Sequence, residues 1–151
     1  MESIRKEDLR KAWLTAAAIS GAVISAIFVY ALVVEAVSRS MPFKPPLAGP
    51  TAAAVRYAFY ILGTVAVFAL RFIRPVMKTR AEEPTGKILQ TLVKRTALTA
   101  AMAEIPAFLG LMLFFLAGSR WDFYLLAAFS TAIELIYFPK YRIWEEKLRD
   151  G

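Results

Sequence analysis

The fold of this chain is decided by residues 96–118, which read TALTAAMAEIPAFLGLMLFFLAG. A transmembrane helix needs about 20 mostly apolar residues, and this run meets the requirement with Glu104 as its single charge. Three further runs, residues 13–37, 52–72 and 121–138, have a similar length and composition. The sequence therefore predicts an all-α, polytopic membrane protein whose 151 residues form a single domain of four transmembrane helices.

The composition excludes several classes of function. Of the 151 residues 58% are apolar, whereas a soluble domain is usually about 45–50% apolar. The chain has no Cys and no His, so the usual ligands of zinc, iron–sulfur clusters and haem are missing, as are Cys nucleophiles and His bases. No Asp-rich motif takes their place. We therefore expect no enzymatic activity, no cofactor and no metal site.

The net charge of +7 is distributed unevenly and predicts an orientation. Fifteen of the 19 Lys and Arg residues fall in the N-terminal arm, the middle connection and the C-terminal tail. By the positive-inside rule, these three segments lie in the cytoplasm and the protein is a multi-pass protein of the cell (inner) membrane. The sequence lacks a folded basic module for nucleic acid. The expected partners are membrane lipids and either another membrane protein or a second copy of this chain.

Prolines predict where two of the helices begin and end. Pro139 is expected to end the fourth span, and residues 140–149 are then expected to form a short interfacial helix. Pro84 or Thr85 is expected to start a helix that continues into the third span. Each of these segments has an apolar stripe, formed by Tyr141, Trp144 and Leu148 in the first case and by Ile88, Leu89, Leu92 and Val93 in the second.

An internal repeat is suggested by residues that recur at fixed offsets. Arg56, Phe59, Tyr60 and Pro75 recur 64 residues later as Arg120, Phe123, Tyr124 and Pro139, and Leu14-Thr-Ala-Ala17 recurs 84 residues later. This favours two helical hairpins in parallel orientation, related by an axis along the membrane normal. The alternative is that these residues recur because every span needs an aromatic anchor, a cation and a residue that ends the helix. If the repeat holds, Ser20 takes in the first hairpin the place of Glu104 in the second.

Glu104 is the most informative polar residue, because it lies about 12 Å into its span at 1.5 Å per residue. A carboxylate at that depth is costly and needs a reason. One hypothesis is a proton or cation site made by Glu104 with Ser20. The alternative is a structural Glu, hydrogen-bonded to a neighbouring helix through Ser20 or Ser25. Pro106 is expected to kink the helix nearby, and Gly110 to allow close helix approach.

Four other charged residues lie within or at the ends of the spans. Glu134 and Arg71 are expected at a similar shallow depth on the inner side, which predicts a structural pair. Glu35 and Arg56 lie near the outer ends of adjacent spans, so they are expected either to pair or to extend toward water.

Two stretches resemble known families. The stretch from Ala103 to Leu113, AEIPAFLGLML, resembles the ion-carrying helix of rotary ATPase proteolipids, the c-subunits, and residues 80–84 are similar to their polar loop. This resemblance implies that Glu104 matches the ion-binding carboxylate, in duplicated hairpins of which one lacks the acid. The closing stretch, residues 137–146, looks like the end of small four-span bacterial membrane proteins, which implies no activity.

The functional hypothesis is a non-catalytic membrane protein that acts as an accessory subunit or helix-packing partner in a membrane complex. The alternative is a proton- or sodium-linked, proteolipid-like component that uses Glu104. Small residues on the first and third spans favour close packing. They are Ala16, Ala17, Ala18, Ser20, Gly21 and Ser25 on the first span, and Ala97, Ala100, Ala101 and Ala103 on the third.

Overall fold

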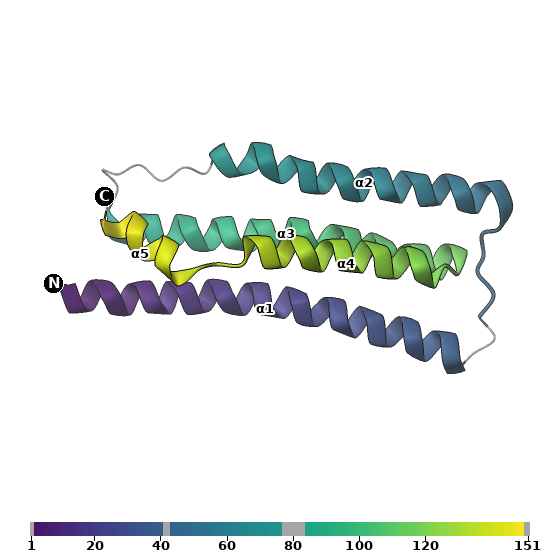
Figure 1. Cartoon of the computed structure of the whole chain (residues 1–151), viewed down its shortest axis with the longest axis horizontal. Helices are drawn as coiled ribbons and strands as arrows, with labels where there is room; N and C mark the ends of the chain where they lie inside the picture. Colours follow the sequence, from purple (N-terminus) through teal and green to yellow (C-terminus); the bar gives the residue numbers. More distant parts are fainter. Residues whose placement is uncertain (1, 41–42, 77–83, 150–151) are drawn as a thin grey trace.

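Helices account for most of the chain that the structure, a computed structural model, describes, namely residues 2–40, 43–76 and 84–149 (Figure 1). In chain order the helices are α1 (Glu2–Ser40), α2 (Gly49–Val76), α3 (Thr85–Ala117), α4 (Arg120–Tyr137) and α5 (Tyr141–Arg149). Within these ranges there is no strand, so the expectation of an all-α protein is confirmed.

Three of the helices are long and apolar enough to cross a membrane. The qualifying segments are Lys6–Ser40 in α1, Gly49–Phe72 in α2 and Thr85–Ala117 in α3. The predicted fourth span corresponds to α4, which has 18 residues and carries Arg120, Asp122 and Glu134. At 1.5 Å per residue α4 is about 27 Å long, slightly less than a hydrocarbon core of about 30 Å.

The predicted helix boundaries agree with the structure where it describes them. Pro84 is the N-cap of α3, and the apolar stripe on the first turns of α3 is buried. α4 ends at Tyr137, two residues before Pro139, and the tail forms α5 as expected. Of the polar loop expected at residues 80–84, residues 80–83 lie outside the described residues.

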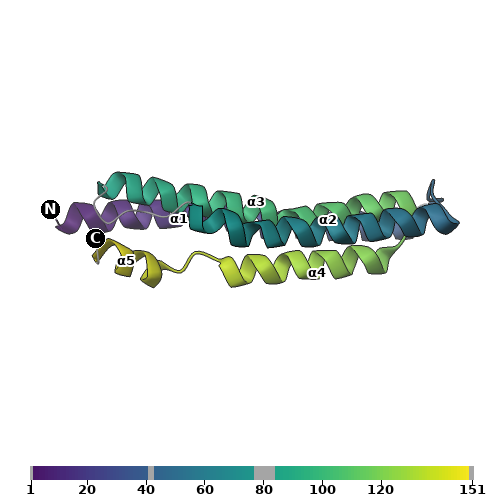
Figure 2. The same cartoon turned by 90° about the horizontal axis from the view of Figure 1, so that it is seen from above.

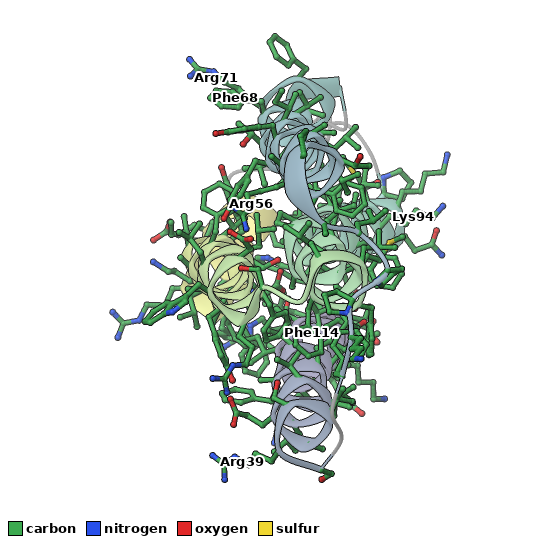
Figure 3. All side chains as sticks on the ribbon, turned by 90° about the vertical axis from the view of Figure 1, so that its right-hand side faces the viewer. Arg39, Arg56, Phe68, Arg71, Lys94 and Phe114 are labelled. Carbon is green, nitrogen blue, oxygen red and sulfur yellow. The ribbon has the colours of Figure 1, made fainter. Side chains whose placement is uncertain are left out.

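α3 occupies the centre of the molecule. α1 and α2 lie along opposite sides of α3, and α4 and α5 lie against one face of this layer (Figure 1, Figure 2). The end-on view shows α1 and α2 at the two extremes (Figure 3). α3 and α4 pack extensively, whereas α1 and α2 are separated by α3, so the two predicted hairpins differ in packing. The duplicated-hairpin relation therefore stays a prediction.

Close approach of α3 and α4 depends on Gly110, as the sequence predicted. A Cβ atom at Gly110 would lie 3.2 Å from the Cα of Phe123 and 3.1 Å from the Cβ of Leu126. By contrast, a Cβ atom at Gly21 on α1 would meet nothing within 4 Å. A larger residue at position 110 would therefore require α4 to move away by a few tenths of an ångström, so Gly110 favours the close approach of the two backbones.

Both ends of the described chain lie at the same end of the bundle. The start of α1, the start of α3 and α5 are neighbours there (Figure 1). Apolar contacts among these three helices hold them together, and the buried members of this cluster are Leu9, Ala16, Ile88, Leu89, Leu92, Trp144 and Leu148. The indole Nε1 of Trp13 also donates a hydrogen bond to the carbonyl of Pro139 (3.0 Å), which fixes how α1 lies along α4.

Candidate functional site

Glu104 is hydrogen-bonded across the interface between α1 and α3. Its Oε1 accepts a hydrogen bond from the hydroxyl of Tyr30, with an oxygen–oxygen distance of 2.5 Å. The sequence suggested Ser20 or Ser25 as the partner instead, but the hydroxyl of Ser25 donates to the carbonyl of Gly21 in its own helix (2.9 Å). Helical side chains point back toward the helix N-terminus, so the long Tyr30 side chain reaches a level about one turn before its own Cα.

The other side of Glu104 borders a shallow hollow of about 210 Å³ on the surface of α3. Ala101, Ile105 and Phe108 line the rest of this hollow, and Phe108 is half exposed. The carboxylate of Glu104 is therefore bound on one side and accessible from outside the bundle on the other.

Glu134 of α4 is the second carboxylate of the interior and is almost completely buried, with 1% of its surface exposed. It lies beside Ser20 of α1, and it is close enough to Glu104 for the two carboxylates to interact electrostatically. Its Oε2 has no hydrogen-bond partner among the described residues. Two carboxylates and two hydroxyls, from Ser20 and Tyr30, thus gather where α1, α3 and α4 meet.

The position of Ser20 follows from the antiparallel course of α1 and α4. The hydrogen bond from Trp13 to Pro139 sets the register between the two helices. Ser20 lies seven residues after Trp13, and Glu134 lies five residues before Pro139. At 1.5 Å per residue these separations are similar, about 10 and 8 Å. Ser20 therefore reaches the level of Glu134 and lies beside that carboxylate, whereas the sequence analysis gave Glu104 as its partner.

The predicted pair of Glu134 and Arg71 is not what the structure shows. Arg71 is exposed and points away from the bundle at the outer edge of α2 (Figure 3). α2 packs mainly against α3 and makes few contacts with α4, so a cation on that edge of α2 cannot reach Glu134. An exposed Arg near the end of a helix keeps its charge solvated at low cost.

Glu35 and Arg56, the other predicted pair, do not contact each other, and each binds a different residue. The Nε of Arg56 lies 2.7 Å from Oδ2 of Asp122, and the hydroxyl of Tyr60 donates to Oδ1 of the same carboxylate (2.9 Å). These contacts join α2 to the start of α4. The exchange of partners occurs because α3 separates α1 from α2, while α4 can contact both.

Glu35 is bound by an Arg and a Tyr of α4 that have the same spacing as Arg56 and Tyr60 of α2. The hydroxyl of Tyr124 donates to its Oε1 (2.6 Å), and the Nη1 of Arg120 lies 3.9 Å from that oxygen. Arg39 adds a contact of 3.0 Å from within α1. Each Arg-x-x-x-Tyr motif therefore holds one carboxylate on another helix, Asp122 in one case and Glu35 in the other.

Ser130 is an interior polar residue that the sequence analysis did not single out. Its hydroxyl, buried on α4, donates to the carbonyl of Ala103 and accepts from the backbone N–H of Ala107 (3.3 Å) on α3. These two backbone groups flank Pro106, which lacks an N–H donor and disturbs the hydrogen bonding of the helix. A Ser on a facing apolar helix, near a mid-helix Pro, is the signal that could have indicated this contact.

The chemistry available to this cluster is that of oxygen ligands only. Among the described residues, no three His, Cys, Asp or Glu side chains are grouped so that they could hold a metal ion. Two carboxylates with two hydroxyls can bind protons or a small monovalent cation, or they can join helices through hydrogen bonds.

No family model matches the chain, and no curated protein or solved structure matches it either. The fold and the cluster define a class of protein by themselves. In its described residues the chain is all-helical, with three helices capable of crossing a membrane and with one buried carboxylate, that of Glu134, between its helices.

We predict that Tyr30→Phe destabilises the bundle by about 0.5–2 kcal/mol, because it removes the interhelical hydrogen bond to Glu104. Tyr57→Phe is the matched control, since Tyr57 is 68% exposed. The free energy of unfolding in lipid bicelles measures both changes. Equal stability of the two variants would show that the bond from Tyr30 to Glu104 does not hold α1 against α3.

Proposed function

We propose that this chain is a non-catalytic integral membrane protein that crosses the cell membrane four times and acts as an accessory subunit or helix-packing partner. In this proposal the N-terminus, the C-terminus and the middle connection are cytoplasmic. The single observation that carries the accessory role is the position of α2, which packs mainly against α3 and leaves most of its surface unburied.

The contacts made by the charged residues of α4 support this helix as the fourth span. Charges within a membrane are tolerated when they face the bundle interior and are paired. Asp122 is bound by Arg56, Arg120 contacts Glu35, and Glu134 is buried beside Ser20. The three charged residues of α4 thus each have a contact on another helix.

The location of the termini also favours an even number of crossings. The N-terminal end of α1 and the helix α5 lie at one end of the bundle (Figure 1). Three crossings would place them on opposite sides of a membrane. The concentration of Lys and Arg at this end supports its assignment to the cytoplasmic side.

The exposed face of α2 is bulky and apolar, which suits packing against another membrane protein. Only 17% of its most apolar 18-residue stretch is buried within the chain, the same share as for α1, but α1 also packs along α4 and α5, whereas α2 makes few contacts beyond α3. The large exposed side chains on this helix are Tyr57, Ile61, Leu62, Val65, Phe68 and Phe72. A helix that packs mainly against one neighbour gains stability from another, since packing drives helix association in lipid.

The absence of cysteine allows a clean test of the accessory role, because each introduced Cys is unique. We propose Ile61→Cys on α2, labelled with bimane, and Leu32→Cys on α1 as the matched control; the native side chains are 63% and 69% exposed. In native membranes we expect a lipid-soluble nitroxide to quench bimane at Leu32→Cys strongly and at Ile61→Cys weakly. After purification into lipid vesicles at high dilution, both positions should be quenched. Equal quenching at the two positions in native membranes would contradict the proposal that a partner protein covers α2.

A second candidate function is a proton- or sodium-linked component that uses Glu104. The specific observation that favours it is the pair of neighbouring carboxylates, of which Glu104 borders an outward-facing hollow. The resemblance of this stretch to proteolipid helices agrees with the same role. Under this function, the hydrogen bond from Tyr30 would orient Glu104 for ion binding.

Carbodiimide labelling tests the second candidate, because the reagent enters apolar sites and modifies protonated carboxyl groups. An ion-binding Glu104 should be labelled at a rate that falls as the pH or the sodium concentration rises, and Glu104→Gln should abolish the label. Glu134→Gln is the comparison variant and should retain labelling at Glu104. A rate at Glu104 that is insensitive to pH and sodium would exclude this function.

A further inference from the structure

A hollow of about 310 Å³ lies at the junction of α3, α4 and α5, away from the carboxylate cluster. This volume is at the lower end of the range for small-molecule sites, about 300–1,000 Å³. Its lining comprises Leu92, Arg95, Thr96, Thr99, Ile136, Tyr137, Phe138, Pro139, Lys140, Ile143 and Trp144.

The hollow arises from the break between α4 and α5. α4 ends at Tyr137, and the chain then turns at Pro139 before α5 begins (Figure 2). α5 is held in place because Trp144 and Leu148 are buried against α1 and α3. The carbonyl of Pro139 is bound by Trp13, so the turn itself is anchored. The hollow is thus formed by segments with fixed positions.

Among the residues that the structure describes, the charged side chains of the lining are Arg95, which is partly buried, and Lys140, which is exposed, and both are cations. Glu145 and Glu146 on α5 are exposed and do not line the hollow. A phosphate or another anion is therefore the ligand that the electrostatics favour.

The surroundings of the hollow are those of a membrane interface. Tyr137 and Trp144 are aromatic residues of the kind that lie at the level of lipid head groups. Ile136 and Ile143, 69% and 45% exposed, add apolar surface beside the two cations. Basic pockets between membrane helices on the cytoplasmic side bind anionic head groups.

We propose that this hollow binds the phosphate head group of an anionic phospholipid, with the phosphate at Arg95 and Lys140 and the acyl chain along Ile136. Inorganic phosphate shares the head-group chemistry, but it would not use the apolar surface of Ile136 and Ile143. The proposal rests on the cytoplasmic membrane interface proposed for this end of the bundle, and not on the accessory role of α2.

Native mass spectrometry of the full chain in detergent tests the proposal. We expect one retained phosphatidylglycerol molecule, bound at least about tenfold more tightly than phosphatidylcholine. The double variant Arg95→Gln and Lys140→Gln should remove this preference. The control variant, Lys94→Gln and Arg142→Gln, loses the same charge at exposed positions outside the lining and should keep it. Circular dichroism confirms that each variant is helical.

Three results would overturn the proposal. The first is an equal loss of preference in the two double variants, which would indicate diffuse attraction to the basic end. The second is equal retention of both lipids by the unaltered chain. The third is full displacement of phosphatidylglycerol by millimolar inorganic phosphate, which would indicate a soluble anion as the ligand. If the Arg95 variant does not fold, Lys140→Gln alone should still weaken phosphatidylglycerol binding about threefold, and unchanged binding would contradict the site. None of these results depends on whether a partner covers α2.

Discussion

The docking of α4 on α3 at Pro106 is the constraint on which the rest of the structure depends. Pro106 offers no N–H to the carbonyl of Met102, and at the next pair along α3 the hydroxyl of Ser130 donates to the carbonyl of Ala103 and accepts from the N–H of Ala107. Gly110, one turn further, allows the two backbones to approach. In a bilayer, where water does not satisfy backbone groups, such a contact has a directional role that apolar packing alone does not provide.

The carboxylate cluster and the outer contacts follow from this docking. With α4 fixed on one face of α3, Glu134 faces α1 and meets Ser20. The start of α4 then lies between the outer ends of α1 and α2, where Asp122 and Glu35 are held by the two Arg-x-x-x-Tyr motifs. The contacts of Ser20 and Glu35 join α1 to α4, and the contact of Asp122 joins α2 to α4, so together they help to fix how α1 and α2 lie beside α4.

The helices were predictable from local properties, whereas the polar pairs were not. Apolar runs mark the spans, Pro84 and Pro139 mark helix limits, and the stripe that includes Trp144 marks the apolar face of α5, because each signal lies within one element. The pairing of Glu35 and Arg56 assumed that consecutive spans touch, but α3 lies between α1 and α2. Which helices are neighbours is a property of the packing, and no single segment of the sequence encodes it.

The free energy of unfolding of Ser130→Ala in lipid bicelles, compared with that of Thr131→Ala, tests this account most directly. The hydroxyl of Thr131 donates to the carbonyl of Ala127 (2.9 Å), so this hydrogen bond lies within α4 and not between helices. The account predicts a loss of about 1–2 kcal/mol for Ser130→Ala and a change near zero for Thr131→Ala. Equal stability of the two variants would contradict the claim that the contact of Ser130 with α3 organises the bundle.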